Sequence, residues 1–297
     1  MKSALGILIK RNTKMFFKDK GLFFTSLITP LILLVLYGTF LSNVYKDSFL
    51  MGIPEGFDVS EKIIDGVVSG QLFSSLMAVS CITVAFCSNM LMVQDKVTGN
   101  VMDLKVSPVK SSVLAIGYYV STLISTFVVS FVAVGACLVY VYMTGWYMSA
   151  SDVALVCLDV FILVMFGTVL SSIINMYLSS QGQISAVGSI VSSCYGFICG
   201  AYMPISQFSE GLQKVLSFLP GTYGTSLLRN HCMQGALSEL EESGVPGEVI
   251  EGLKDVVDCN VYFFDEKVSI SSMYLYLGIT VVVLMAVYIL LNALRRK

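Results

Sequence analysis

The sequence predicts an all-α polytopic membrane protein with six transmembrane helices, built as a single transmembrane domain over residues 1–297. Three observations predict this class. Of the 297 residues, 56 % are hydrophobic and only 13 % are charged, whereas soluble domains carry about 25 % charge. The charges gather between long apolar runs, and six runs can each cross a hydrocarbon core of about 30 Å. Lysine and arginine concentrate on one set of alternating loops, which is typical of a chain that crosses a membrane repeatedly.

Residues 3–20 precede the first run and predict an amphipathic helix at the membrane interface. Its apolar stripe is imperfect, because Asn12 interrupts it, and consists of Leu5, Leu8, Ile9, Met15 and Phe16. Its bases, which can face anionic headgroups or a protein partner, are Lys10, Arg11, Lys14 and Lys18. The alternative is a basic flank that only sets the topology. The first apolar run is about 20 residues long, too long for the core of a cleaved signal peptide, so we expect it to stay in the membrane.

The spans are expected at about residues 22–42, 70–93, 113–142, 153–178, 184–203 and 271–293. The fourth and fifth are joined only by residues 179–183, so they form a tight helical hairpin. Residues 94–112 form a loop between the second and third spans. Residues 43–67 and 204–270 are too polar to span, and the longer of the two divides into a moderately apolar part, 204–232, and a strongly acidic loop, 233–270.

Lysine and arginine predict the orientation of these spans. The side that holds both chain ends and the loops 94–112 and 179–183 carries twelve basic residues and three acids. The opposite side carries six basic residues and sixteen acids. Because basic loops stay in the cytoplasm, we expect cytoplasmic termini, a cytoplasmic loop at 94–112 and an acidic extracellular loop at 233–270. The protein is then a multi-pass protein of the cell (plasma) membrane.

Motifs for catalysis and for nucleotide binding are absent from the sequence. It contains no G-x-x-x-x-G-K-[ST] phosphate loop, no G-x-S-x-G and no H-E-x-x-H, which mark nucleotide sites, serine hydrolases and zinc proteases. One histidine, His231, cannot build a histidine metal site or a Ser-His-Asp triad, and no C-x-x-C pair occurs. We therefore expect no enzymatic activity, no bound cofactor or metal, and no nucleic acid partner.

One carboxylate, Asp159, lies about two turns into the fourth span from its outer end. A carboxylate is costly in hydrocarbon and tends to face a cavity or a partner. Asp159 then lines a substrate path that favours cations. Alternatively, it lies close enough to the outer headgroups to stay hydrated.

Six of the eight cysteines lie inside apolar runs, where a thiol usually acts as a small packing residue. The other two, Cys232 and Cys259, fall in the outer segment. An oxidising exterior would allow them to form a disulfide that closes a loop of about 27 residues.

Two sequence patterns carry a resemblance to a known family. In the cytoplasmic loop stand Gly99, Leu104, Ser107 and Pro108, and Gly117 opens the next span. In the outer segment stand Gly200-x-x-x-Pro204, then Glu210 and Leu212, then Pro220-x-Thr222-Tyr223, then Arg229. At both places the chain resembles the type-2 ABC transporter permease family, the membrane subunits of many bacterial drug, antibiotic and polysaccharide exporters. It departs from that family at Val97, Asn100, Ser209 and Met102, the last with Asp103 one place beyond the usual acid.

The resemblance implies the transmembrane fold of type-2 ABC exporters and a role for each pattern. In the cytoplasmic loop, a short helix would couple to a groove on a cytoplasmic ABC ATPase subunit through Gly99, Asp103, Leu104, Ser107 and Pro108. Between spans five and six, two short re-entrant helices would cap the pathway through Gly200, Pro204, Glu210, Pro220, Thr222, Tyr223 and Arg229. Arg229 would pair with Glu210 or with the C-terminal ends of these helices. The alternative is a surface loop with an exposed arginine.

The resemblance also implies a dimer with a second permease subunit, identical or paralogous, surrounded by membrane lipid. ATP and magnesium would bind to the partner ATPase. The substrate path would run between the permeases along the second and fifth spans. Besides Asp159, this nominates Ser75, Thr83, Asn89, Ser189 and Ser193. Small hydroxyl residues also help helices to pack closely, and we favour packing for most of these positions.

The function implied by the resemblance is ATP-driven export of an amphipathic drug, peptide or lipid-like substrate from a bacterial cell, as in multidrug and antibiotic resistance. An ATP-independent secondary transporter or channel is the alternative. Such a transporter usually shows inverted repeats and helices broken near the bilayer centre. No repeat is evident here, and Pro108 and Pro204 lie at the ends of spans, although Pro30 lies in the first span. A membrane-bound sensor or assembly factor is a third possibility.

Overall fold

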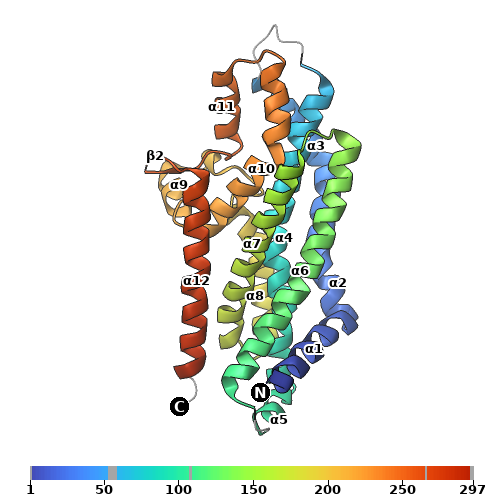
Figure 1. Cartoon of the computed structure of the whole chain (residues 1–297), viewed down its shortest axis with the longest axis vertical. Coiled ribbons are helices and arrows are strands. Elements are labelled where there is room, and N and C mark those ends of the chain that lie inside the picture. Colours follow the sequence, from blue (N-terminus) through green and yellow to red (C-terminus); the bar gives the residue numbers. More distant parts are fainter. Residues whose placement is uncertain (1, 53–58, 107–108, 265, 295–297) are drawn as a thin grey trace.

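A computed structural model describes residues 2–52, 59–106, 109–264 and 266–294, and long helices run side by side along its longest axis (Figure 1). Within these ranges, five helices are long and apolar enough to cross a membrane: Lys20–Phe40, Glu61–Val97, Ser112–Thr144, Ala150–Tyr177 and Ile270–Leu294. The all-α, polytopic fold class is therefore confirmed. The expected span at 184–203 is not among the five, so the count of six stays a prediction.

The first helix, α1 (Lys2–Lys18), lies obliquely across the foot of α6 (Ser111–Thr144) at the end of the bundle that carries α5 (Asn100–Val106) (Figure 1). Leu8 and Phe16 are buried in this contact. A Cβ atom on Gly117 would lie 3.2 Å from the Leu8 Cβ, so a glycine lets the two helices approach closely. The amphipathic helix expected at 3–20 is present, and its apolar face packs on protein.

The second helix, α2 (Lys20–Leu36), continues through a π-helical turn, Tyr37–Leu41, into α3 (Ser42–Gly52). The helical path therefore extends about ten residues beyond the span expected at 22–42, since a π turn shifts the helix without ending it. The segment 43–67, which the sequence indicates is too polar to span, contains α3 and the start of the next helix. Residues 53–58 lie outside the described residues.

The central helix is α4 (Glu61–Val97), which is 37 residues long and extends beyond the expected span at 70–93. In its most apolar stretch, 94 % of the residues are buried inside the protein. The extension before residue 70 is more polar, yet it packs on protein: a Cβ atom on Gly66 would come within 2.6 Å of the Tyr147 ring. A helix that is buried on all sides forms the core of its bundle.

The next pair of helices is α7 (Ala150–Tyr177) and α8 (Gln181–Ile198), joined by the tight connection that the sequence predicts. A capping box between Ser149 and Asp152 begins α7. Helix α8 ends five residues before the expected limit of 203. The reason is Gly200, whose φ of +74° belongs to the left-handed region that terminates helices.

The segment between α8 and the last helix, α12 (Ile270–Leu294), is largely helical. It contains a 3₁₀ turn (Ile205–Gln207), α9 (Glu210–Leu216), α10 (Pro220–Glu242), α11 (Gly247–Val256) and the antiparallel strands β1 (Tyr262–Phe263) and β2 (Glu266–Lys267). We name this segment, 199–269, the outer cap, after the side of the membrane and the role that the sequence predicts for it.

The division at 232/233 into a re-entrant segment and an acidic loop is wrong, because α10 runs through it. Met233, Ala236, Leu237 and Leu240 are buried at helical spacing along α10, and α11 buries Ile250 and Leu253. The acidic residues Glu241 and Glu242 lie on the exposed side of the end of α10. The acidic composition therefore describes one face of a helix and not a loop.

Candidate functional site

The outer cap is organised around Arg229, whose side chain is completely buried in α10. Its Nη1 donates to Asp258 Oδ2 at 3.1 Å, and its Nη2 donates to the Gly200 carbonyl oxygen at 2.6 Å. The same Nη2 lies 3.5 Å from Ser75 Oγ on α4. The expected partner Glu210 is therefore wrong, as is the exposed arginine of the alternative. The Gly200 carbonyl follows α8, not a re-entrant helix.

Asp258 connects the arginine to the turn after Pro204. Its Oδ2 accepts the amide proton of Ile205 at 2.5 Å, and its Oδ1 accepts that of Ser206 at 3.3 Å. Burial raises the pKa of the Asp258 carboxyl, and the Arg229 guanidinium opposes this rise. Because a buried charge is stable only when it is paired and hydrogen-bonded, the cap depends on this ion pair.

The other motif residues of the outer cap hold its turns in place. A Cβ atom on Gly200 would lie 2.9 Å from Ile205 Cγ1, and the positive φ of this residue also requires glycine. Pro220 is at the first turn of α10, where no amide donor is needed. Thr222 Oγ1 donates to the Leu216 carbonyl at 2.8 Å, and the Tyr223 hydroxyl donates to that of Ser217 at 2.5 Å. These two bonds tie the start of α10 to the end of α9.

A cavity of about 480 Å³ opens between α9 and the chain that follows α11. Its charged lining residues are Glu210, Lys214, Asp255 and Asp258. Glu210 thus faces this cavity and does not contact Arg229 by a hydrogen bond. The cavity presents more acids than bases toward the outer cap's surface.

Asp159 lies in α7 and is 1 % exposed. Its Oδ2 is 2.6 Å from His231 Nδ1 of α10, and its Oδ1 accepts from the Tyr274 hydroxyl of α12 at 2.5 Å. Both expectations for Asp159 are therefore wrong, because it neither lines an open path nor stays hydrated. His231, for which the sequence predicts no role, thus pairs with this carboxylate. A carboxylate inside a membrane span requires a partner. This requirement is the feature of the sequence that could have indicated the contact between Asp159 and His231.

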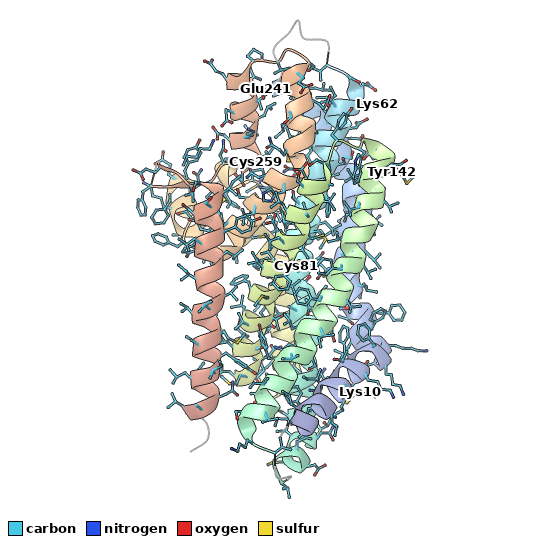
Figure 2. All side chains as sticks on the ribbon, in the orientation of Figure 1. Lys10, Lys62, Cys81, Tyr142, Glu241 and Cys259 are labelled. Carbon is cyan, nitrogen blue, oxygen red and sulfur yellow. The ribbon has the colours of Figure 1, made fainter. Side chains whose placement is uncertain are left out.

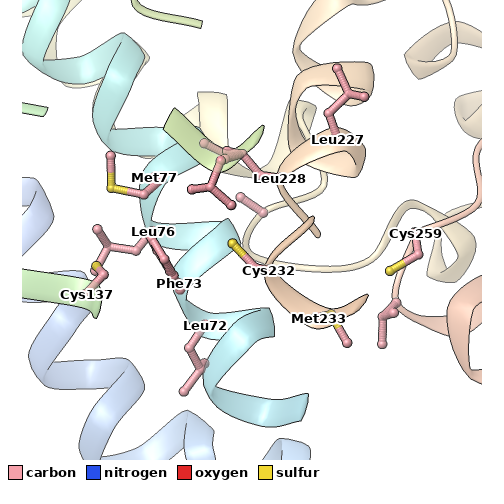
Figure 3. Close-up of a cluster of buried hydrophobic side chains, with 14 of the residues drawn as sticks. Leu72, Phe73, Leu76, Met77, Cys137, Leu227, Leu228, Cys232, Met233 and Cys259 are labelled. Carbon is pink, nitrogen blue, oxygen red and sulfur yellow. The ribbon is translucent and has the colours of Figure 1, made fainter. Parts of the chain in front are cut away.

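The two cysteines of the outer cap are free and buried, so the proposed Cys232–Cys259 disulfide is wrong. Figure 3 shows their thiols well apart, with Met233 between them in this view. Burial raises the pKa of the Cys259 thiol to about 12, so little reactive thiolate forms there. Both residues are buried, as are Cys81, Cys87, Cys137 and Cys199, whereas Cys157 is half-buried and Cys194 is exposed.

The five hydroxyl and amide residues proposed to line the pathway divide into two groups. Ser75, Thr83 and Asn89 are buried in α4, and the Asn89 side-chain amide donates to Ser171 Oγ and Ser172 Oγ of α7 at 3.2 and 3.0 Å. These residues serve packing within one chain. Ser189 and Ser193 lie on the exposed face of α8, where the Ser193 hydroxyl donates to the Ser189 carbonyl.

At the other end of the bundle, Gly99 adopts a φ of +84° directly after α4 and redirects the chain into the short helix α5. Met102 is 67 % exposed and Val106 is 89 % exposed. Asp103 is exposed and Leu104 is half-buried. Ser107 and Pro108 lie outside the described residues, so their expected role at the end of this helix stays a prediction.

The base of α5 is held by two charged contacts. Asp95 of α4 accepts two hydrogen bonds from Arg11 of α1, at 2.7 and 3.0 Å, and one from the Tyr118 hydroxyl of α6 at 2.5 Å. The Lys96 ammonium donates to the carbonyls of Asn175, Met176 and Leu178 at the end of α7, where a cation is favourable.

Sequence reasoning assigned Arg11 to headgroups or a partner and treated Lys96 only as a topology signal. Asn12, expected to interrupt the apolar stripe, is buried and accepts a hydrogen bond from Arg11 at 2.8 Å. The feature of the sequence that could have indicated the contact with Arg11 is Asp95 itself, because it is one of only three acids among twelve bases on the side predicted to be cytoplasmic.

A protein-family model described as ABC-2 type transporter matches residues 3–232 of the chain. The matched residues include nearly all of α1, all of α5, and the outer cap as far as Arg229 and the three residues after it. A search of curated proteins gives no match.

Proposed function

This chain belongs to the ABC-2 type transporter family and is a multi-pass permease component of an ABC transporter, and we propose from that premise that it exports its substrate. ATP and magnesium would bind to a separate cytoplasmic ABC subunit, since the sequence contains no phosphate loop. The chain would pair with a second permease in a bacterial plasma membrane, with both termini in the cytoplasm.

The observation that carries this proposal is the way in which α5 is attached to the helix bundle. The helix exposes Met102 and Val106, and exposed apolar side chains are typical of a surface that binds another protein. It follows a helix whose end is joined to three others through Asp95 and Lys96. A force applied to α5 by an ATPase would therefore reach α1, α4, α6 and α7 together.

At the opposite end, the outer cap would close the pathway. Arg229 joins α10 to the end of α8 through Gly200, and to the turn after Pro204 through Asp258. Irregular backbone near a membrane is stable where protein buries its polar groups, and these contacts supply such burial. A movement of α8 would thereby move the cap.

The surface of α8 supports a path between two permeases for an amphipathic drug, peptide or lipid-like substrate. Ser185, Ser189 and Ser193 are exposed at intervals of four residues, which places them on one helical face. Ile190 and Phe197 are 60 % and 48 % exposed on the same helix. This mixture of hydroxyl and large apolar groups suits a substrate that has both polar and apolar parts.

The test is reconstitution in liposomes with ABC ATPase subunits encoded beside this chain. We expect a stable complex whose ATP hydrolysis and transport require both proteins. Replacement of residues 99–108 by a flexible Gly-Ser linker should abolish transport while membrane insertion persists. Transport by the chain without an ATPase would support a secondary transporter or channel and overturn the proposal, and so would full transport with the linker.

A further inference from the structure

A second cavity of about 480 Å³ lies at the α5 end of the bundle, between α1 and the end of α4. Its lining residues are Arg11, Lys14, Met15, Lys18, Asp19, Leu91 and Gln94. The coupling and capping roles proposed above use only Arg11 of this set. Figure 2 shows α1 and Lys10 at the flank of the bundle, away from α12 and the outer cap.

The cavity is basic on one side. Arg11, Lys14 and Lys18 are separated by three and four residues, so they project from one face of α1. Arg11 is held in place by Asp95, whereas Lys14 and Lys18 are exposed. The acid in the lining, Asp19, has its Oδ1 occupied by the Leu22 amide at the start of α2, at 3.1 Å. The charges that face the cavity therefore favour an anion.

The other side of the cavity is apolar, and α2 begins at Lys20, directly after the lining residue Asp19. Met15 and Leu91 line the cavity itself. Phe24, Ile28 and Leu31 follow along α2 at helical spacing and are 60 %, 50 % and 55 % exposed. Because α2 is a candidate membrane span, this face is available to acyl chains.

The depth of the cavity in the membrane follows from its place at the end of a candidate span. That span begins at Lys20, directly after the lining residue Asp19, and Phe16, Phe17 and Phe23 pack together at this junction of α1 and α2, with ring centroids 5.1 to 6.3 Å apart. Lysine and arginine side chains near the end of a span extend to the level of the headgroups. The bases of α1 then lie where the phosphate groups of a bilayer are found.

We propose that this cavity binds one anionic glycerophospholipid, with its phosphodiester between Lys14 and Lys18 and its acyl chains along α2. A free phosphate ion would use the bases but leave the apolar wall and the α2 face uncovered. By holding α1 against the bundle, the lipid would stabilise the Arg11–Asp95 contact that supports α5. The proposal depends on membrane insertion and not on ATP-driven export.

The experiment is native mass spectrometry of the full chain released from mixed micelles of phosphatidylglycerol and phosphatidylcholine. We expect one phosphatidylglycerol to be retained in preference to phosphatidylcholine. The double variant Lys14→Gln/Lys18→Gln should bind it about 25-fold more weakly, since each lysine near an anionic lipid surface contributes about a fivefold change in affinity. The matched control, Lys10→Gln/Lys110→Gln, removes two exposed bases that do not line the cavity and should change the affinity less than about twofold.

Four results would overturn the proposal. These are equal retention of the two lipids by the parent chain, an equal loss of binding in the control variant, and displacement of the lipid by millimolar glycerol 3-phosphate. The fourth is unchanged lipid binding in Lys14→Gln/Lys18→Gln together with weaker association with the ATPase, which would assign these bases to a protein partner. The parent-chain comparison needs no substitution, so it stands even if a variant folds poorly.

Discussion

At the scale of single residues, the outer cap depends on one buried ion pair. Arg229 and Asp258 are 0 % and 6 % exposed, and each also bonds to backbone groups of the turn between α8 and α9. Removing one member of a buried pair leaves an uncompensated charge, which costs about 3–5 kcal/mol. Removal of either residue alone is therefore expected to destabilise the cap.

We predict that Arg229→Met lowers the stability of the folded chain by about 3–5 kcal/mol. The double variant Arg229→Met/Asp258→Asn should be less destabilised than the sum of the single variants, because the lone charge is gone. Thermal unfolding in detergent measures both. The matched control is Lys214→Met, an exposed base of the same cap. An Arg229→Met variant as stable as this control would contradict the prediction.

The sequence predicted which residues of the cap matter better than it predicted their contacts. Gly200, Pro220 and Arg229 were identified by a family pattern, and each has a physical role in a turn or in the buried pair. The partner Asp258 was missed because it lies 29 residues after Arg229 in a stretch with an acidic composition. The composition of that stretch does not indicate which of its acids is buried. The acid that contacts Arg229 is Asp258, which is buried.

At the scale of secondary-structure elements, apolar runs predicted where helices cross the membrane but not where they end. Helix α4 continues to Glu61, and α10 continues to Glu242, beyond the apolar residues that a hydropathy search detects. These outer turns pack on other helices of the same chain, so they can be polar on one face. Lipid imposes an apolar composition on a span, and protein contacts do not.

Helix α5 is the element on which coupling depends, and we predict that Met102→Asp uncouples the transporter. A carboxylate at this exposed apolar position would be costly to bury against a partner. ATP hydrolysis stimulated by the permease should fall at least about tenfold, a loss of about 1.4 kcal/mol in the interaction. Stimulated ATP hydrolysis in liposomes is the measurement. The control is Val256→Asp, an exposed apolar position on α11 at the opposite end, and equal effects of the two variants would contradict the assignment.

At the scale of the whole molecule, the exposed faces differ in chemistry. The outward faces of α2 and α12 are apolar, as membrane lipid requires, with Leu275, Ile279 and Val282 exposed on α12. Helix α8 instead exposes serines beside apolar residues. The central α4 is almost completely buried, so a path between two permeases would be bounded by α8 and not by α4. The second span, which the resemblance placed beside the path, is covered by neighbouring helices that include α2, α6, α7, α8 and α10.

The dimer can be tested with a residue that the chain already carries. Cys194 is exposed on α8, beside Ser193, while the other cysteines are buried or half-buried. If α8 faces a second permease, a short thiol-specific cross-linker added to membranes should join two permease chains through Cys194. The expected product has about twice the mass of the chain when the partner is identical, and mass spectrometry identifies a paralogue. Cys194→Ser should abolish it.

Two further variants distinguish a specific interface from random collision in the membrane. In the Cys194→Ser background, Ser189→Cys should restore the cross-link, because position 189 shares the exposed face of α8. Ile279→Cys in the same background should not, since its 54 % exposed side chain lies on the lipid-facing side of α12. Equal yields from positions 189 and 279 would mean that α8 is simply another lipid-exposed helix. The serines would then serve helix packing alone, and the path for the substrate would have to lie elsewhere.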